Sequence, residues 1–418
     1  MHSLPCWEAQ FERTSSGFRP GRCTHDAAEK IFRSIRPQGK KKWVLDADIR
    51  GCFDNINHEY LLKQIGNFPA RKLIKHWLKA GYVDNNTFHP TEAGTPQGGC
   101  ISPLLANIAL HGMETAVGVK YDYRGDSRGK RIVVRYADDF LILCETKEDA
   151  KEAKKEISQW LSVRGLSLSE EKTKIVHVTE GFDFLGWNFR HYKVSTKKTG
   201  YKLLIKPSKE SVRAIKLRLK EVWLKNRGRE VGAVIKEINP IIRGWANYHR
   251  KMVASETFKN LDSWMYWREQ RYAKHKHPNK NSTWRKNKYF GRFDLKRGDN
   301  WVFGKKETGA YINKFSWFKI ERHRLIPGLH CPDDPNPEVQ QWFREKGARQ
   351  SRDKNESWQK IAKNQKYVCP VCNESLFNGE LTHVHHKIPK SMGGRDTYSN
   401  LVHVHLMCHQ QIHHDTLL

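Results

Sequence analysis

Two short apolar runs on either side of a pair of aspartates form the clearest pattern in the chain. Residues 132–134 and 140–143 are apolar, and Asp138 and Asp139 lie between them. The pattern predicts a tight hairpin of buried strands with both carboxylates at its exposed turn. A divalent cation would relieve the repulsion between the two charges, so the turn is a candidate metal site. The alternative is a solvated turn, because aspartate favours turns through local hydrogen bonds.

A second apolar strand is predicted at residues 43–49. Asp46 and Asp48 are two residues apart and therefore share one face of this strand. A carboxylate inside an apolar strand is costly unless it is paired or bound to a metal. Phe53 follows Asp48 by five residues. This strand is therefore a second candidate contributor to a metal site.

The segments around these strands are predicted to form helices and two glycine-containing loops. We expect helices at 24–35 and 101–113 and an amphipathic stretch at 58–80. In the loop 16–22, Arg19 and Arg22 are able to meet phosphates, and in the loop 94–99, Gln97 is able to hydrogen-bond a closely approaching ligand. Plain surface turns are the alternative for both loops.

Composition points to a polyanionic partner. The 418 residues include 75 Lys+Arg against 45 Asp+Glu, giving a net charge of +30 and a pI near 9.7. The length predicts two to four domains. A mean hydropathy of -0.76 and the lack of a long apolar run speak against a membrane protein, which leaves nucleic acid as the expected partner. Most of the nine cysteines are scattered singly, which is typical of a reducing compartment.

The basic excess is concentrated after residue 193. Between residues 193 and 297, lysine and arginine outnumber aspartate and glutamate more than threefold. Residues 208–227 predict a helix with cations on one face, residues 301–320 a few strands, and the proline-rich residues 331–337 a break. Five aromatics in the basic region have the spacing of core positions and are expected to be buried: Trp245, Tyr248, Trp264, Tyr266 and Trp267.

The last fifty residues contain a second candidate site. Cys369 and Cys372 form a C-x-x-C pair, and His405 with Cys408 supplies a second pair. Three cysteines and one histidine suit a closed structural zinc site. Further polar residues that a zinc ribbon does not require accompany them: His385, His386, Asn400, His409 and His413.

Five ordered motifs resemble those of reverse transcriptases of the group II intron type. They are Asp48 with Phe53, the Pro-Gln-Gly at 96–98, the Tyr-Ala-Asp-Asp at 136–139, the turn and lysine at 165–173, and a primer-grip-like hairpin at 182–187. Residues 234–249 resemble the maturase, or thumb, region of the same family. Their joint occurrence in this order is far more specific than any one of them.

This resemblance implies a right-hand-type polymerase. Asp48, Asp138 and Asp139 match the ligands of two Mg²⁺ ions. Phe53 matches the aromatic gate that favours deoxynucleotides, and Gln97 matches a residue beside the nascent base pair. Further phosphate contacts are expected at Arg19, Arg22 and Lys172.

The C-terminal pattern resembles an HNH endonuclease with a ββα-metal hairpin. By this resemblance His386 is the general base and Asn400 fixes the loop that orients it. His385 and His409, with His413 as a further ligand, would hold one Mg²⁺ or a related cation. Zinc would be bound by Cys369, Cys372, His405 and Cys408, with His403 or His413 as alternatives to His405.

Together these features predict an α+β multidomain protein. The expected domains are fingers (partial) and palm at 1–190, a helical thumb or maturase region at 191–272, a basic DNA-binding linker region at 273–364, and an HNH domain with a zinc knuckle at 365–418. Only fifteen residues precede Ser16, so the fingers are expected to be incomplete.

The predicted function is that of a group II intron-encoded protein. It would copy RNA into DNA, assist splicing of its intron RNA and cut target DNA, using deoxynucleoside triphosphates. An RNA-binding splicing factor with an idle polymerase and a DNA endonuclease carrying a polymerase relic are the alternatives. The expected location is the bacterial cytoplasm near the nucleoid, or an organellar matrix; the intron, the host and the oligomeric state do not follow from the sequence.

Overall fold

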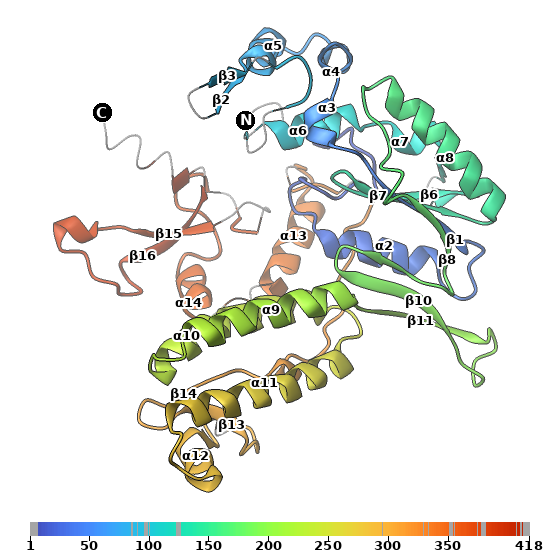
Figure 1. Ribbon diagram of the computed structural model, residues 1–418. Helices are drawn as coiled ribbons and strands as arrows, with labels where there is room; N and C mark the ends of the chain where they lie inside the picture. The colour runs from blue at the N-terminus through green and yellow to red at the C-terminus, as the bar shows by residue number, and fades with distance from the viewer. Residues whose placement is uncertain are drawn as a thin grey trace. The chain divides into compact units, whose positions relative to one another are not determined.

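The chain folds into two compact units in the computed structural model (Figure 1). The first unit comprises Met1–Ile35, Gly39–His177 and Arg324–Leu418, and the second comprises Arg36–Gln38 and Val178–His323. Their mixture of helices and strands confirms the predicted α+β class. The structure describes residues 7–84, 87–89, 91–95, 99, 101–122, 127–294, 296–328, 330–332, 334–350, 354, 356–373, 375–377, 382–406, 408–409 and 412.

A four-stranded antiparallel sheet, in the order β6-β7-β1-β8, forms the centre of the first unit. Its inner strands are nearly continuous apolar runs because helices cover the sheet: α8 packs against β1, β7 and β8, and α2 packs against β6. The strand predicted at 43–49 and the hairpin predicted around Asp138 are therefore confirmed. The bounds are α2 Thr24–Ser34, β1 Trp43–Asp48, β6 Ile132–Tyr136, β7 Asp139–Cys144, α8 Lys147–Ser162 and β8 Lys174–His177.

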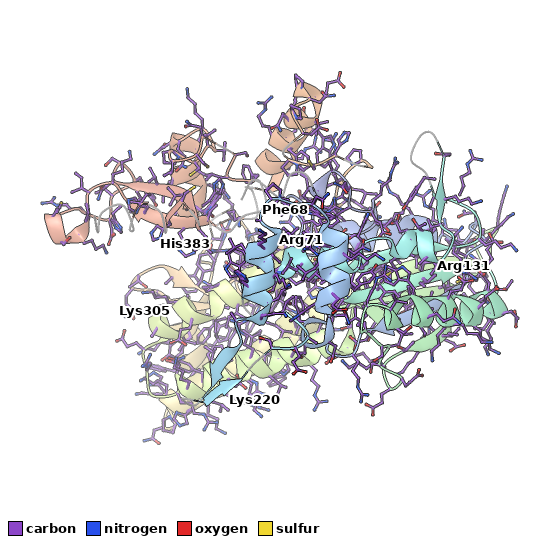
Figure 2. The ribbon with its side chains drawn as sticks, turned by 90° about the horizontal axis from the view of Figure 1, so that it is seen from above. Phe68, Arg71, Arg131, Lys220, Lys305 and His383 are labelled. Atoms are coloured by element: carbon purple, nitrogen blue, oxygen red, sulfur yellow. The ribbon has the colours of Figure 1, made fainter. Side chains whose placement is uncertain are left out.

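Short helices fill the chain between β1 and β6. The amphipathic stretch predicted at 58–80 is two helices, because Gly66 adopts a positive φ of 61° and ends the first of them. Arg71, labelled with Phe68 in Figure 2, begins the second and donates to the carbonyl of Leu62 at 3.2 Å. The elements are α3 Cys52–Asn55, α4 His58–Ile65, α5 Arg71–Lys79, β2 Tyr82–Asp84, β3 Thr87–His89, α6 Ser102–Ala109, α7 Met113–Ala116, β4 Lys120–Tyr121 and β5 Ser127–Arg128.

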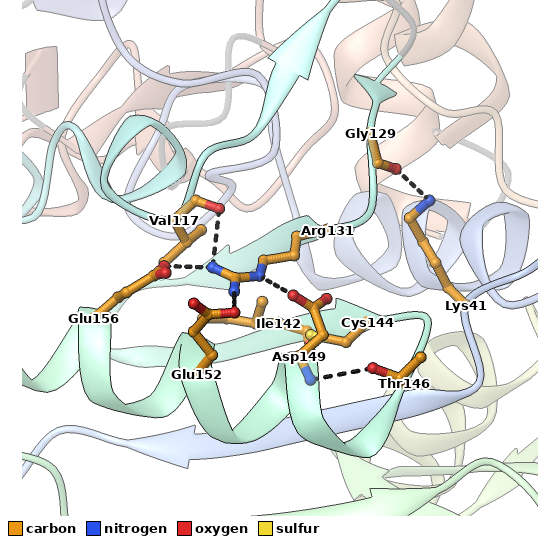
Figure 3. A network of polar contacts seen from close by, with 10 residues as sticks. All are labelled: Lys41, Val117, Gly129, Arg131, Ile142, Cys144, Thr146, Asp149, Glu152 and Glu156. Carbon is orange, nitrogen blue, oxygen red and sulfur yellow. Dashed lines mark hydrogen bonds and ion pairs between the residues drawn. The ribbon is translucent and has the colours of Figure 1, made fainter.

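One arginine fastens α8 to the sheet (Figure 3). Arg131, which immediately precedes β6, donates to Asp149 at 2.8 Å, to Glu152 at 3.3 Å and to Glu156. These three carboxylates lie along one face of α8, whose N-terminus is capped by the hydroxyl of Thr146. The side chains of Arg131 and Asp149 are 10% and 13% exposed, so this ion pair is largely buried and ties the helix to the strand that leads to the aspartate turn.

The second unit begins with a three-stranded sheet and continues into a helical bundle. The hairpin predicted at 182–187 is confirmed: β9 and β10 are joined by Leu185 and Gly186, both with positive φ, as a tight two-residue turn requires. Residues of α9, α10 and α11 share one core with the small sheet that follows. The elements are β9 Phe182–Phe184, β10 Trp187–Lys193, β11 Tyr201–Pro207, α9 Lys209–Lys225, α10 Val231–His249, α11 Ser255–Lys276, α12 Ser282–Tyr289, β12 Phe290–Gly291, β13 Val302–Lys305, β14 Ala310–Tyr311 and the 3-10 helix η1 Phe315–Trp317.

Four of the five aromatics expected in the core are at least partly buried there. Trp245, Trp264 and Tyr266 pack against the core, and Tyr248 stacks on Trp187 with ring centroids 4.4 Å apart. The prediction is wrong for Trp267, whose side chain is 64% exposed. Because α11 turns its apolar face inward at a period of 3.6 residues, the position next to Tyr266 points to solvent.

The C-terminal part of the first unit contains the predicted break and a hairpin. The proline-rich residues 331–337 were expected to form a break, and Pro337 begins a helix that the sequence did not predict. The described residues 406, 408, 409 and 412 after the hairpin are helical. The bounds are α13 Pro337–Gln350, α14 Glu356–Asn364, β15 Thr382–His386, the 3-10 helix η3 Lys390–Met392 and β16 Leu401–His405. Within the described part of the chain, no helix is both long and apolar enough to cross a bilayer.

Candidate functional site

Three carboxylates gather at one edge of the central sheet. Asp48 at the end of β1 is the register partner of Asp139 at the start of β7, and Asp138 occupies the turn before β7. Asp48 and Asp138 line a cavity of about 520 Å³ together with Phe53 and Lys172. The cavity is open to solvent and polar, so it offers hard oxygen donors to a ligand that enters from outside.

A buried arginine holds the aspartate turn in place. Arg135, which is 1% exposed, donates to the carbonyl of Ala137 at 3.0 Å and to the side chain of Asn107 at 2.9 Å. Asn107 in turn donates to the carbonyl of Gly17 at 3.0 Å. The position of the turn that presents Asp138 is therefore fixed by contacts with one helix, α6, and with the loop that contains Gly17.

Gly17 is required for this arrangement. A Cβ atom at Gly17 would lie 2.0 Å from the backbone nitrogen of Ala137, which no side chain tolerates. Ala137 itself has a positive φ of 59°, a strained conformation for a residue with a side chain. Sequence inspection assigned no role to Gly17, Asn107 or Arg135, since their contacts join segments far apart in the chain.

Electrostatics in the cavity favour the arrival of a cation. Desolvation, followed by repulsion from Asp138 and Asp48, raises the pKa of Asp139 to about 6. Lys172 Nζ lies 2.9 Å from Asp48 Oδ2, and this hydrogen bond raises the pKa of the lysine. One ammonium thus partly neutralises three carboxylates. Among the described residues, the three carboxylates do not converge as closely as the cysteine and histidine set described below.

Phe53 and Gln97 were both expected near the nascent base pair, and the structure describes only Phe53. Phe53 lies on α3, lines the cavity and meets Phe18 edge-on with ring centroids 6.0 Å apart. The side chain of Phe18 is 48% exposed. Gln97 lies outside the described residues.

The expected phosphate contact at Arg19 is wrong. Its guanidinium pairs with Glu8 at 2.8 Å, with both side chains 1% exposed, and also donates to the carbonyls of Glu12 and Ser15. The guanidinium of Arg22 donates to the carbonyls of Arg13 at 3.1 Å and Gly328 at 3.0 Å, and a phosphate contact at this residue stays a prediction. Both arginines hold the loop 16–22 in place, and a buried charge of this kind must be paired.

The C-terminal hairpin brings the second set of predicted residues together. His385 and His386 are at the end of β15, opposite Val402 and Leu401 of β16. The ring of His385 lies 5.5 Å from that of His409, centroid to centroid, at an angle of 81°. His413 lies outside the described residues.

Asn400 fixes the loop between the two strands. Its side chain accepts from the amide of Ile388 at 2.8 Å and donates to the carbonyls of Ile388 at 3.1 Å and Arg395 at 3.0 Å. It is only 9% exposed. The loop that follows His386 therefore has a defined path back to β16.

Asp396 is a site residue that sequence reasoning missed. Its Oδ1 lies 2.6 Å from Nε2 of His386, and its Oδ2 accepts from Lys390 at 2.7 Å. The hydrogen bond from Lys390, and then that from His386, lower the pKa of Asp396. The carboxylate thus orients one nitrogen of His386 and leaves Nδ1 for other chemistry. The sequence signal for this role was weak: Asp396 is an acidic residue in the loop that contains Gly393 and Gly394.

Four thiol and imidazole groups converge beside this hairpin. One ligand atom from each of Cys369, Cys372, His405 and Cys408 lies within 4.8 Å of the others. Cys372 Sγ is 3.3 Å from Nδ1 of His405. His403, the alternative to His405, is buried against Trp358 instead, and burial lowers its pKa to about 4. Three thiols and one imidazole whose ligand atoms lie this close together fit a structural zinc ion with four ligands.

Comparison with known protein families matches this organisation. Residues 2–189 match the model of the reverse transcriptase (RNA-dependent DNA polymerase) family, residues 212–290 that of the group II intron maturase-specific domain, and residues 369–415 that of the HNH endonuclease family. The matches lie in the order that the sequence motifs predict.

Two curated relatives are similar to part of this chain. The group II intron-encoded protein LtrA of Lactococcus lactis subsp. cremoris is 33% identical over 257 residues, covering 47% of this chain and 42% of LtrA. Protein YkfC of Escherichia coli (strain K12) is 33% identical over 218 residues, covering 44% of this chain and 57% of YkfC. The chain thus spans less than two thirds of either relative.

Among solved structures, the chain is similar to telomerase from Candida albicans in complex with a fragment of telomeric RNA. The alignment covers 66% of this chain and 50% of the telomerase chain, with 14% sequence identity and a TM-score of 0.38. In their order along the chain, the three family matches show a reverse transcriptase region, a group II intron maturase-specific region and an HNH endonuclease region, so the chain is similar to group II intron-encoded proteins such as LtrA.

Proposed function

We propose that this chain acts in group II intron mobility, as an RNA-directed DNA polymerase, a splicing maturase and an HNH DNA endonuclease. The observation that carries the proposal is the meeting of Asp48 and Asp139 across neighbouring strands, with Asp138 and Phe53 at the same cavity. The proposed domains are residues 1–190, 191–272, 273–364 and 365–418. The proposed location is the cytoplasm or an organellar matrix.

In the polymerase, the three aspartates would hold two Mg²⁺ ions, and carboxylate oxygens are the donors that Mg²⁺ prefers. When bound, the ions supply positive charge to the attacking and leaving oxygens of the primer 3′ hydroxyl and the incoming nucleotide. Lys172 would leave Asp48 as the ions enter and become available to the triphosphate. Arg135 keeps the turn of Asp138 in place, and the ring of Phe53 would exclude a ribose 2′ hydroxyl.

The maturase role is supported by the basic surface of the second unit. On α9 the apolar Ile215, Leu219 and Trp223 are buried, and the opposite face carries exposed cations. Lys220, labelled in Figure 2, is one of them; the exposed set is Lys209, Arg213, Arg218, Lys220 and Lys225. These five cations outnumber the two exposed carboxylates of the helix, Glu210 and Glu221. This excess of positive charge fits the phosphates of intron RNA, and its binding would weaken steeply with salt.

In the HNH module, His386 would act as the general base on a water that attacks a DNA phosphodiester. Asp396 holds Nε2 of His386, so Nδ1 would take the proton. His385 and His409 would hold a single cation, which supplies charge to the phosphate and the leaving oxygen when bound. Imidazole donors suit first-row transition metals better than Mg²⁺, so Mn²⁺ should be tested beside Mg²⁺. Zinc on the Cys₃His set would have a structural role.

Primer extension on an RNA template tests the proposal. The wild-type chain should extend a DNA primer with Mg²⁺ and deoxynucleotides, and the double variant Asp138→Ala/Asp139→Ala should not. Glu148→Ala removes an exposed carboxylate at the start of α8 and should leave extension unchanged. Extension that persists in the double variant would contradict the assignment, and a folded wild-type chain that binds RNA without extending would leave splicing and DNA cleavage as its functions.

A further inference from the structure

The second unit contains a pocket that the proposed catalytic and phosphate-binding roles do not use. It has a volume of about 440 Å³, within the range of pockets that bind small organic groups, about 300–1,000 Å³. One face of α11 forms its floor, and the chain between β12 and η1 forms a wall. Its main lining residues are Asp262, Tyr266, Trp267, Glu269, Trp301 and Lys314.

Aromatic rings dominate this pocket, and two of them are unusually exposed. The side chain of Trp267 is 64% exposed and that of Trp301 is 45% exposed. Tyr266 meets both rings edge-on, at centroid distances of 5.5 Å and 6.1 Å. Exposed aromatic side chains on a strongly basic unit are the kind of surface on which unstacked nucleobases pack.

A buried carboxyl group, that of Glu269, lines the pocket together with these rings. Glu269 is 7% exposed, and the described residues give it neither a hydrogen bond nor an ion pair. The charged groups nearby are already engaged: Asp262 accepts from the amides of Phe315 and Ser316, and Lys314 donates to Asp299 at 2.6 Å. Burying a carboxyl without a partner is costly, so the group calls for a ligand that supplies the missing hydrogen bonds.

The surroundings of the pocket are cationic, which identifies the class of ligand. Lys286 Nζ lies 3.9 Å from the centroid of the Trp301 ring, and Lys314 is one of the residues that line the pocket. These cations offer contacts to a backbone phosphate next to a base held between the rings. An apolar peptide side chain would form no hydrogen bond with the carboxyl group of Glu269 and no ion pair with the cations.

We propose that this pocket binds a single unstacked nucleobase of RNA, with Trp267 and Trp301 stacking on it and Glu269 hydrogen-bonding its Watson–Crick edge. This inference rests on the RNA-binding role proposed above and adds a base-specific subsite to it. The phosphates on either side of the base would meet Lys286 and the basic surface around the pocket.

Anisotropy binding of the full chain to short, fluorescein-labelled single-stranded RNA tests the subsite. The probes are the four homopolymers, an RNA of equal length with abasic riboses, and the DNA equivalents. Trp267→Ala should weaken binding of the best base-containing RNA by about 5- to 150-fold, the range for the loss of one stacked base, and leave abasic binding unchanged. Trp284→Ala, which removes another exposed tryptophan outside the pocket, is the matched control.

Glu269 variants separate recognition from folding. Glu269→Leu should weaken binding of the base-containing RNA about tenfold without lowering the melting temperature, because it removes a desolvated carboxyl. Glu269→Gln keeps a donor and an acceptor and should retain most of the binding. Tighter binding of the DNA oligomers than of RNA would overturn the RNA assignment.

The failures of the two proposals are distinguishable. If wild type binds base-containing RNA and both Trp267→Ala and Glu269→Leu bind like Trp284→Ala, the base subsite is refuted while the RNA-binding role stands. If wild type binds abasic and base-containing RNA equally, the subsite is also refuted. If wild type binds no RNA, both proposals fail.

Discussion

Replacement of Glu269 by glutamine should stabilise the second unit by an amount that grows with pH. Burial raises the pKa of Glu269 from 4.5 to about 8, because desolvation outweighs the attraction of Lys314, and Asp262 and Asp299 add repulsion. The folded chain therefore holds this proton more tightly than the unfolded chain. Below about pH 4.5 the carboxyl is neutral in both states and its protonation costs nothing.

The magnitude follows from the difference between the two pKa values. As pH rises from 4.5 to about 8, the free energy of unfolding of wild type falls relative to that of Glu269→Gln by about 1.4 kcal/mol per pH unit. The full difference is on the order of 5 kcal/mol, a large fraction of the stability of a domain. Because Glu269 is only 7% exposed, solvent screening reduces this little.

Urea unfolding followed by tryptophan fluorescence, at several pH values between about 5 and 8, measures this difference. The control is Glu256→Gln, which changes a carboxylate on the same helix that is 79% exposed and pairs with Lys206. The gap between Glu269→Gln and wild type should widen steadily with pH, and the gap for the control should stay flat. Parallel curves for all three proteins would refute the reasoning, since they would mean that Glu269 ionises in the folded chain as it does in water.

Three further predictions concern the other sites. Gly17→Ala should cost about 1–3 kcal/mol of stability in thermal unfolding and reduce primer extension, because the new methyl displaces the aspartate turn, whereas Gly228→Ala, where nothing lies within 4 Å, should change neither. Asp396→Asn should lower the rate constant of DNA nicking about 10- to 100-fold with little change in KM, and Asp396→Glu should recover part of it; equal rates would show that Asp396 does not position His386. Cys372→Ser should abolish the binding of one zinc ion per chain in atomic absorption, while Cys331→Ser should retain it, and zinc-free wild type would refute the Cys₃His site.

Local patterns predicted the parts of the fold that local physics decides. The hairpin around Asp138 follows from two apolar runs and a turn, and the short hairpin at 182–187 was expected from its resemblance to a primer-grip motif. The zinc candidates were found because cysteine and histidine spacing carries its own chemistry. In each case the decisive residues are neighbours in the chain.

The failures involve contacts between distant segments or positions with two plausible environments. The sequence predicts that Arg19 faces solvent and contacts phosphate, but in the structure Arg19 is buried and pairs with Glu8. The dependence of the aspartate turn on Gly17 is visible only when Ala137 is placed against it. Trp267 has an apolar side chain beside core residues, but it falls on the outer side of α11. Gly66 ends the first of the two helices in residues 58–80, whereas the amphipathic pattern predicted one continuous stretch.

The measurement that tests the central claim most directly assays two activities in the same preparations. Wild type, Asp138→Ala/Asp139→Ala and His386→Ala are each tested for primer extension on RNA and for nicking of supercoiled plasmid DNA with Mg²⁺ or Mn²⁺. The account predicts that the aspartate variant nicks without extending and that His386→Ala extends without nicking. Extension by the aspartate variant, or nicking by His386→Ala, would contradict the assignment of polymerase and endonuclease to these two sites.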